Sequence, residues 1–419
     1  MTTTQRITTT RRTFDPARWP DVARVPRPGP RAVIARALFT TATARLPLSV
    51  RRPDGRVLSA GPAGAPVMIL HDPAAFYARL GADGLIGFGE SYLAGEWDCT
   101  DLTGLITVFA AHVTDLLPPV LQRLRMIAAR RQPRGDRQTH DGARRNIERH
   151  YDLSNDFFAL FLDETMTYSA ALFDDGPGEP LVSGQRRKVS RLLDEAGVGP
   201  GTRLLEIGTG WGELALQAAR RGATVTTVTV SREQADLASR RVAEAGLADR
   251  VSVELRDYRD VTGQFDAVCS CEMIEAVGDR YWDAYFAAID RVLAPGGRVA
   301  LQAITMPHDR MLASRHTYTW IQKYIFPGGL IPSLTAIDQS LARCGTLRVT
   351  SRLDFGADYA RTLSLWRERF CARRDEVADL GFDDIFARMW FFYLCYAEAG
   401  FRAGYLDVSQ LRLERRQPA

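Results

Sequence analysis

An acid followed by regularly spaced glycines is the segment of this chain best suited to binding a nucleotide. Glu206 opens an acid-x-Gly-x-Gly-x-Gly pattern that includes Gly208 and Gly210. Alternate glycines let the backbone turn sharply and approach a ligand with no side chain in between. The apolar run before Glu206 predicts a buried strand, and Leu214–Ala219 predicts a helix whose first N–H groups would face the ligand.

The spacing of the glycines indicates which nucleotide would bind. A dinucleotide site has the spacing G-x-G-x-x-G, with an acid about twenty residues later for the ribose. Here the next predicted strand ends at Thr229 and Val230 without an acid, and Gln234 follows. The acid before the glycines favours S-adenosylmethionine (SAM) over NAD. A nicotinamide-dependent dehydrogenase and a glycine-rich turn without a ligand are the competing interpretations.

Strand-like and helix-like runs alternate after residue 185, which predicts a parallel α/β sheet with crossover helices, the Rossmann-like arrangement of SAM-dependent methyltransferases. The expected strands are 202–207, 224–230, 250–254, 265–270 and 297–303. A stretch rich in aromatics and prolines, 306–338, interrupts the pattern and is expected to be a cap over the active site. The apolar run 385–401 is either core or the wall of an acyl tunnel.

The composition of the 419 residues is that of an ordinary globular protein, with 46% hydrophobic and 25% charged residues. The net charge of +4 is modest, and the absence of a nucleic-acid-binding motif disfavours a nucleic-acid partner. No apolar run reaches the roughly 20 residues that span a bilayer. The six cysteines are scattered, which favours free thiols over disulfides or a metal site.

The chain is expected to divide into four parts. Residues 1–31 read as a poorly ordered tail without a secretory signal, and 32–115 as a small mixed α/β domain. Residues 116–149 combine apolar residues at helical spacing with many arginines, and 150–419 form the catalytic domain. The Arg-rich segment could lie on an anionic membrane surface, or it could be a solvated linker.

Several separated motifs resemble the cyclopropane-fatty-acyl-phospholipid synthase family, and the resemblance covers nearly everything after the first thirty residues. The matching segments are 87–92, 95–99, 150–158, 166–173, 205–212, 257–260, 273–275, 324–327 and 355–359. The resemblance implies transfer of the SAM methyl group to a cis double bond within an acyl chain. It also implies an N-terminal domain that engages phospholipid.

The resemblance assigns SAM contacts by position. Gly208 and Gly210 would meet the methionine portion after Glu206, and His150 and Tyr151 would belong to a lid. The remaining expected contacts are Tyr168 and Ser169 near the carboxylate and sulfonium, Thr229, Val230 and Gln234 at the ribose, and Asp257 and Tyr258 at the adenine.

The family's active site holds a bicarbonate ion, and the resemblance places Glu275, Tyr359 and the backbone of Ile304 at that ion. This chain departs from the family at two of the positions. Ala170 stands where ring-forming members have a cysteine, and Gln302 stands where they have a histidine. Glutamine cannot act as a base but can hydrogen-bond an ion or water. Retention of bicarbonate is therefore an open question.

Glu275 is the only carboxylate in the matched pocket motif 273–275. It would orient bicarbonate or act as the base itself, and the alternative is a structural, salt-bridged glutamate. Methyl transfer to an alkene leaves a carbocation, so the placement of the base selects the product. Direct loss of a proton from the new methyl closes a ring, whereas loss after hydride migration leaves a methylene. Faces of Tyr168, Phe158 and Tyr359 would stabilise the cation.

The altered residues, together with 301–305 and 315–320, are similar to an actinobacterial branch of the family. Members of that branch methylate oleoyl phospholipid at C10 and leave an exocyclic methylene, which a separate reductase saturates to give tuberculostearic acid. A cyclopropane synthase and a catalytically decayed lipid-binding homologue are the alternatives. The resemblance further implies a homodimer that is cytoplasmic and peripheral on the inner face of the membrane.

Overall fold

The structure is a computed structural model that describes residues 15–112, 153–174, 176, 178–315 and 317–416. The chain divides into two compact units, and each is built from separated segments. Unit 1 comprises 1–131, 316–325 and 370–405. Unit 2 comprises 132–315, 326–369 and 406–419. The Arg-rich segment 116–149 and the proposed lid residues His150 and Tyr151 lie outside the described residues.

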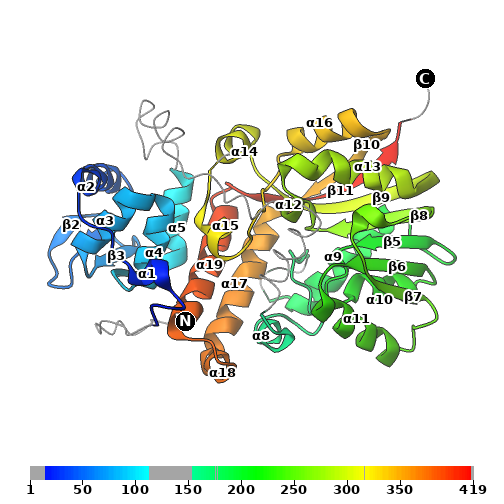
Figure 1. Cartoon of the computed structure of the whole chain (residues 1–419), viewed down its shortest axis with the longest axis horizontal. Helices are drawn as coiled ribbons and strands as arrows, with labels where there is room; N and C mark the ends of the chain where they lie inside the picture. Colours follow the sequence, from blue (N-terminus) through cyan, green and yellow to red (C-terminus); the bar gives the residue numbers. More distant parts are fainter. Residues whose placement is uncertain (1–14, 113–152, 175, 177, 316, 417–419) are drawn as a thin grey trace. The chain divides into compact units, whose positions relative to one another are not determined.

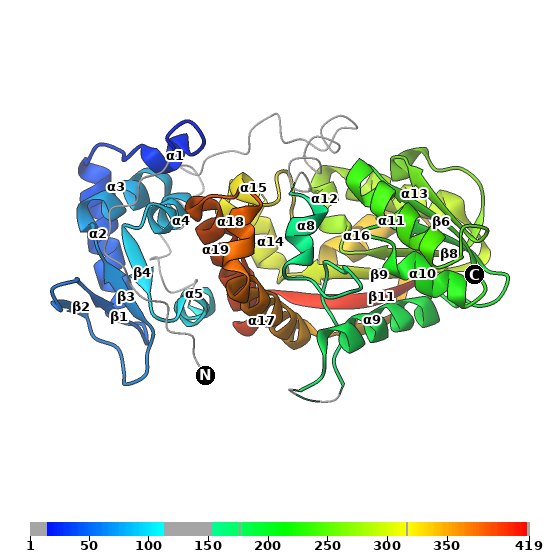
Figure 2. The ribbon, with the colours of Figure 1, turned by 90° about the horizontal axis from the view of Figure 1, so that it is seen from below.

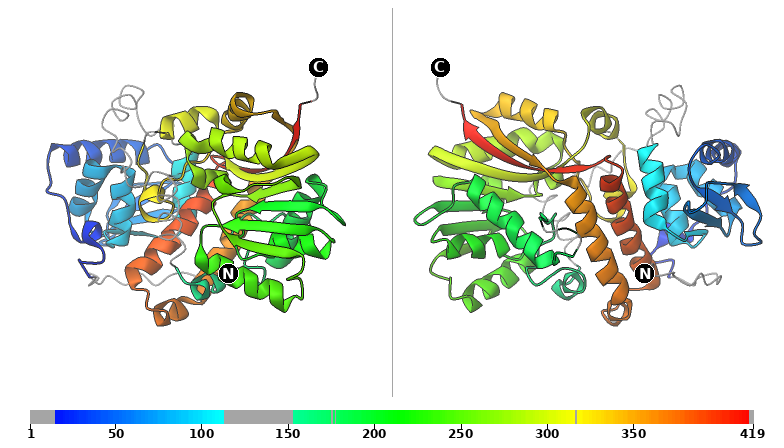
Figure 3. Two further views of the ribbon diagram at one scale, coloured as in Figure 1. Left: turned by 45° about the vertical axis from the view of Figure 1, so that its right-hand side comes forward. Right: turned by 180° about the vertical axis from the view of Figure 1, so that it is seen from behind.

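Unit 2 contains a seven-stranded sheet with the order β10-β11-β9-β8-β5-β6-β7. The strands are β5 (Arg203–Ile207), β6 (Thr224–Thr229), β7 (Val251–Leu255), β8 (Phe265–Cys271), β9 (Leu293–Thr305), β10 (Leu347–Asp354) and β11 (Asp407–Arg415). Strands β7, β6, β5, β8 and β9 are parallel, whereas β11 runs antiparallel to β9 and β10. Figure 3 shows β11, in red, beside β9.

The five predicted strands and the Rossmann-like fold are confirmed, with boundaries that shift by a few residues. The antiparallel pair β10 and β11 was not expected. Strand β11 inserts between β9 and β10 although it is the last strand of the chain. The parallel pattern of the earlier segments carries no information about this antiparallel insertion.

Helices cover both faces of this sheet, as a parallel sheet requires (Figures 1 and 2). One core joins the sheet to α13 (Trp282–Val292) and α16 (Leu334–Cys344). The opposite core joins it to α9 (Leu181–Glu195), α10 (Glu213–Arg220) and α11 (Arg232–Glu244). The unit also contains α8 (Asn155–Ala159), α12 (Ile274–Val277), α14 (His308–Ser314) and most of α17 (Gly356–Ala372).

Unit 1 contains a four-stranded sheet with the order β2-β1-β3-β4, which confirms the expected smaller α/β fold. Its strands are β1 (Ser49–Arg51), β2 (Val57–Ser59), β3 (Val67–Leu70) and β4 (Trp97–Cys99). Its helices are α1 (Pro20–Ala23), α2 (Pro30–Thr43), α3 (Pro73–Asp83), α4 (Leu85–Leu93), α5 (Leu102–Ala111), α15 (Trp320–Tyr324), α18 (Arg374–Asp379) and α19 (Asp384–Arg402). The apolar run predicted at 385–401 is therefore α19, most of which is buried.

Residues 15–31 differ from the expected unstructured tail. Arg79 is buried, forms an ion pair with Glu96 at 2.8 Å, and donates to main-chain oxygens of Asp21 and Val22. A buried guanidinium needs acceptors for its five N–H donors, and this part of the chain supplies them. These hydrogen bonds to Arg79 hold the short helix α1 in place.

The expected cap 306–338 divides between the two units. Helices α14 and α16 belong to unit 2, whereas α15 belongs to unit 1. Within unit 1 the Tyr324 hydroxyl donates to Glu90 at 2.9 Å, and Lys323 forms an ion pair with the same carboxylate. In the described part of the chain, none of the helices has the length and apolar character to cross a membrane.

Candidate active site

The glycine-rich loop follows β5 and leads into α10. Gly208 has φ +95° and Gly210 has φ +51°, values that L-residues with side chains rarely adopt. A Cβ atom on Gly208 would lie 2.5 Å from Cγ of Met273, whereas one on Gly210 would meet nothing within 4 Å. Gly208 is therefore required for packing as well as for backbone geometry.

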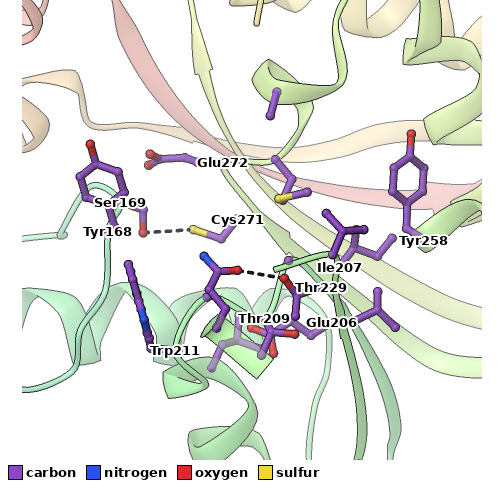
Figure 4. Close-up of a pocket in the computed structure, with 18 of the residues that line it drawn as sticks. Tyr168, Ser169, Glu206, Ile207, Thr209, Trp211, Thr229, Tyr258, Cys271 and Glu272 are labelled. Carbon is purple, nitrogen blue, oxygen red and sulfur yellow. Dashed lines mark hydrogen bonds between the residues drawn. The ribbon is translucent and has the colours of Figure 1, made fainter. Parts of the chain in front are cut away.

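A pocket opens beside this loop, and all ten predicted cofactor-binding residues line it. They are Tyr168, Ser169, Glu206, Gly208, Gly210, Thr229, Val230, Gln234, Asp257 and Tyr258. Figure 4 shows Tyr168, Ser169 and Glu272 gathered toward one end, with Tyr258 toward the other. The arrangement gives an elongated ligand two chemically different ends.

Glu206 is buried at the end of β5, where it accepts a hydrogen bond from the Thr227 hydroxyl at 2.7 Å. Burial raises the pKa of Glu206 to about 8, against the opposing effects of Thr227 and Lys188. On the neighbouring strand, Thr229 donates to the side-chain oxygen of Gln234 at 2.9 Å (Figure 4). That bond holds Gln234 at the position where a dinucleotide site would present an acid.

Asp257 and Tyr258 follow β7. The carboxylate of Asp257 accepts two bonds from the guanidinium of Arg259, at 2.8 and 2.6 Å. This fork-shaped pairing fixes the turn that presents the Tyr258 ring to the pocket. An aromatic ring in this place suits stacking on a nucleobase.

At the other end of the pocket Tyr168 belongs to an aromatic cluster. Its ring stacks on Trp366 with centroids 5.2 Å apart, and meets Phe158 edge-on at 5.2 Å. The main chain after Tyr168 is held on α17, because Ala171 N–H donates to the hydroxyl of Thr362 at 3.1 Å. Of these rings Tyr168 lines the pocket, whereas Phe158 and Trp366 are fully buried and hold Tyr168 in place.

Glu272 is the residue that the sequence interpretation missed. One of its oxygens, Oε1, accepts from the backbone N–H of Ala170 at 2.9 Å and from the side-chain amide of Gln302 at 2.7 Å. The other, Oε2, accepts from the hydroxyl of Tyr359 at 2.7 Å. Three predicted catalytic residues therefore surround one carboxylate, and that carboxylate lines the pocket.

Glu275 is the only carboxylate within the segment 273–275, but the carboxylate that lines the pocket is Glu272, which lies just before that segment. Its signal was available in the sequence as an acid two residues after the end of the predicted strand 265–270. The carboxyl ends of parallel strands are where ligands bind in such sheets. Glu272 also has φ +51°, an unusual value for a residue with a side chain.

Glu275 and Ile304, the other two predicted catalytic residues, pair with each other. The backbone N–H of Ile304 donates to Oε1 of Glu275. Burial and, to a smaller extent, the neighbouring charge of Glu272 together raise the pKa of Glu275 to about 8. Oε2 of Glu275 is buried without a hydrogen-bond partner in the structure. Glu275 does not line the pocket, so it supports the site from behind Glu272.

The residues expected to hold bicarbonate do not fit that ion here. Its expected donors, the N–H of Ile304 and the hydroxyl of Tyr359, already bind carboxylates of this chain. Gln302 binds Glu272 as well. An additional anion among two glutamates would meet repulsion rather than free donors. The carboxylate of Glu272 therefore takes up two of the groups, Gln302 and Tyr359, that were expected to face the ion.

Lys188 is a second residue that the sequence interpretation did not assign. It is 1% exposed, lines the pocket, and donates to the hydroxyl of Ser169 at 2.6 Å. Its positive charge lowers the pKa of both Glu206 and Glu272, against the larger effect of burial. It therefore supplies the pocket with a buried cation close to two acids.

Comparison with known proteins extends this description. The family model for mycolic acid cyclopropane synthetase matches residues 138–411. Tuberculostearic acid methyltransferase UfaA1 of Mycobacterium tuberculosis is 54% identical over 415 residues, which cover 97% of each chain. The cyclopropane-fatty-acyl-phospholipid synthase of Escherichia coli is 36% identical over 342 residues, covering 81% of this chain and 86% of that one.

Two solved structures show the same fold. The cyclopropane synthase MmaA2 of Mycobacterium tuberculosis superposes with a TM-score of 0.60 at 31% identity, covering 64% of this chain and 97% of that one. The mycolic acid cyclopropane synthase CmaA1, complexed with S-adenosylhomocysteine, also gives 0.60 at 29% identity, covering 68% and 99%. The pocket, the glycine loop and these similarities agree: this chain is a SAM-dependent methyltransferase and belongs to the mycolic acid cyclopropane synthetase family.

Proposed function

We propose that this enzyme transfers the methyl group of SAM to the cis double bond of an oleoyl chain in a phospholipid and forms a 10-methylene branch. This product is the precursor of 10-methylstearic (tuberculostearic) acid. The similarity to a tuberculostearic acid methyltransferase over nearly the whole chain supports the proposal. The observation that carries it is the carboxylate of Glu272, held by three donors at the end of the pocket.

The pocket would bind SAM with its adenine near Tyr258 and its sulfonium near Tyr168. Tyr168, which lines the pocket and packs against the buried rings of Phe158 and Trp366, would help to exclude water and to hold the alkene in line with the methyl group. The bound cofactor supplies an electrophilic methyl group. The alkene electron pair would attack that methyl carbon, so that a carbon–carbon bond forms while the sulfur–methyl bond breaks, S-adenosylhomocysteine leaves with the sulfur electron pair, and a cation remains on the lipid. The face of Tyr168 would stabilise that cation by about 2 kcal/mol when desolvated.

Glu272 would then accept a proton from the lipid. Hydride migration from C10 to C9 moves the cation to the carbon that bears the new methyl. Loss of one methyl proton to Glu272 leaves the electron pair as an exocyclic double bond. The carboxylate suits this step because all its hydrogen-bond partners in the structure donate to it. Its charge also stabilises the cation before the proton leaves.

The five predicted catalytic residues would support Glu272 in two ways. They are Ala170, Gln302, Tyr359, Glu275 and Ile304. Gln302, Tyr359 and the N–H of Ala170 hold Glu272 as an acceptor. Glu275, bound to the N–H of Ile304, presents a largely protonated carboxyl near neutral pH because burial raises its pKa to about 8. A neutral neighbour lets Glu272 carry the charge without strong repulsion.

The proposal extends to the partners of the enzyme. Phospholipid in an anionic membrane would be the substrate, and unit 1 would engage it at the cytoplasmic face. The E. coli relative is named as acting on fatty-acyl phospholipid, which supports this substrate class. We also propose a basic linker at 116–149, a catalytic domain with an acyl tunnel at 150–419, a homodimer, and a separate reductase that consumes the product.

The purified enzyme tests this function with dioleoyl phosphatidylglycerol vesicles and SAM carrying a ¹³C-labelled methyl group. The proposal predicts labelled exocyclic methylene carbons in the lipid, detected by NMR. Glu272→Gln should abolish the signal, while Glu414→Gln, on β11 outside the pocket lining, should retain it. A labelled cyclopropane carbon would instead favour the ring-forming activity. Lipid that carries no label after incubation with folded wild-type enzyme would oppose both activities.

A further inference from the structure

The amide of Gln302 can either help or oppose the carboxylate of Glu272. A glutamine side chain presents an NH₂ donor on one side and a carbonyl acceptor on the other. Only the donor stabilises an anion. The orientation must therefore follow from the groups that surround the amide.

Those groups form a continuous chain that begins at a cation. Arg191 on α9 donates from Nη1 to Oε1 of Gln410 at 2.7 Å. Gln410 on β11 donates from Nε2 to Oε1 of Gln302 at 3.0 Å. Gln302 on β9 donates from Nε2 to Oε1 of Glu272 at 2.7 Å. We call this chain the Arg191 relay.

The direction of every bond in the Arg191 relay is determined. A guanidinium has only donors, so the oxygen of Gln410 must face Arg191. The NH₂ of Gln410 then faces the Gln302 oxygen, and it also donates to the main-chain oxygen of Lys188 at 3.1 Å. The main-chain oxygen of Lys188 can only accept, so this second bond fixes the Gln410 amide in the same orientation. Rotating either amide by half a turn would bring two oxygens together.

Burial and strand pairing keep the relay rigid. Gln302 is 0% exposed and Gln410 is 1% exposed, so water does not compete for these groups. The two residues are direct partners in the antiparallel register of β9 and β11, which places their side chains on the same face. Arg191 is in turn held by Glu195, one turn along α9, at 2.9 Å.

We propose that Arg191 and Gln410 are positioning residues for methyl transfer, which fix Gln302 as a donor and thereby hold Glu272 ready to accept a proton. Neither residue lines the pocket, so both act through Gln302. The inference rests on the role given to Glu272 in the proposed function. Physically, a donated hydrogen bond favours the charged carboxylate and opposes the burial that raises the pKa of Glu272.

The test measures kcat and KM for SAM between pH 5.5 and 9 in wild type, Gln410→Leu, Gln302→Leu and the double variant. In Gln410→Leu the oxygen of Gln302 loses its donor, and only the longer bond from Nε2 to the main-chain oxygen of Ala170, at 3.4 Å, and the bond to Glu272 itself still orient the amide. Gln410→Leu should move the acidic limb of the kcat profile up by about one pH unit, which lowers kcat roughly tenfold at pH values below that limb. The KM for SAM should change less than about twofold.

The double variant shows whether Gln410 acts through Gln302. In the Gln302→Leu background, Gln410→Leu should move the acidic limb no further, because the group through which it acts is gone. Equal shifts in both backgrounds, or no shift in either, would overturn the proposal. Ser409→Ala is the matched control, because the neighbouring Ser409 is equally buried but donates to Asp354. Its profile should match wild type.

Two further arms separate the possible failures. The side chain of Arg191 is 25% exposed, so Arg191→Met should fold even if Gln410→Leu does not. Arg191→Met should also move the acidic limb of the kcat profile to higher pH. If Glu272→Gln keeps the wild-type rate, the proposed role of Glu272 is wrong. If Glu272→Gln is inactive while Gln410→Leu and Arg191→Met leave the limb unmoved, only the relay is wrong.

Discussion

The hydroxyl of Tyr359 and the carboxylate of Glu272 meet at 2.7 Å although 87 residues separate them in the chain. Tyr359 comes from α17, and Glu272 follows β8. The contact joins a residue assigned by family resemblance to one that no resemblance identified. It makes Glu272, rather than Glu275, the centre of the site.

Tyr359→Phe should weaken methyl transfer by removing a donor from this carboxylate. The pKa of Glu272 would rise because burial would be less opposed. Activity that needs the ionised carboxylate is lost as the pH falls, so the acidic limb of kcat should move upward. We expect roughly a tenfold loss at pH values below that limb, measured by transfer of radiolabelled methyl to lipid. An unchanged pH profile would contradict this role of Tyr359.

Glu272→Gln should lower kcat by about 10³-fold, within the range for loss of a positioned general base. SAM affinity, measured by calorimetry, should change much less, because the glycine loop and the ribose-side residues remain intact. A variant that loses SAM binding and activity together would indicate a structural role instead.

Gly208→Ala and Gly210→Ala form a matched pair for the SAM loop. Both glycines have positive φ, but only a Cβ on Gly208 would collide, at 2.5 Å from Met273. Gly208→Ala should weaken SAM binding at least about tenfold more than Gly210→Ala, which bears only the backbone strain of about 1 kcal/mol. Calorimetric titration of both folded variants checks this order. Equal losses would show that the packing against Met273 does not matter.

The buried acids should make the protein less stable as the pH rises. Burial raises the pKa of Glu275 to about 8 in the folded protein, above the ordinary glutamate value of 4.5. Between these values the unfolded chain releases a proton that the folded chain keeps. The free energy of unfolding should therefore fall by about 1 kcal/mol per pH unit for this group.

Glu275→Gln should remove that contribution and flatten the dependence on pH. Urea unfolding at several pH values between 5 and 8 measures the effect, and Glu414→Gln, at a half-buried position, serves as control. A slope in Glu275→Gln equal to that of wild type would contradict the raised pKa.

Much of the SAM site could be predicted from the sequence, because its residues belong to short motifs next to predicted strands. The glycine loop, the strand before it and the residues after β6 and β7 are all close to a recognisable strand end, and each lines the pocket as expected. Glu272 is also at a strand end, but the segment that resembles the family begins at Met273, so the resemblance did not identify Glu272. Gln410 could not be found locally, because β11 joins the sheet by an antiparallel insertion between β9 and β10.

In the proposed mechanism the carboxylate of Glu272, and not bicarbonate, accepts the proton that the lipid loses. The most direct measurement is the methyl-transfer rate of wild type and Glu272→Ala in CO₂-free buffer, with and without added bicarbonate. We predict a wild-type rate that does not depend on bicarbonate, and an inactive Glu272→Ala in CO₂-free buffer. A wild-type enzyme that stops without bicarbonate and recovers when it is added would contradict the account.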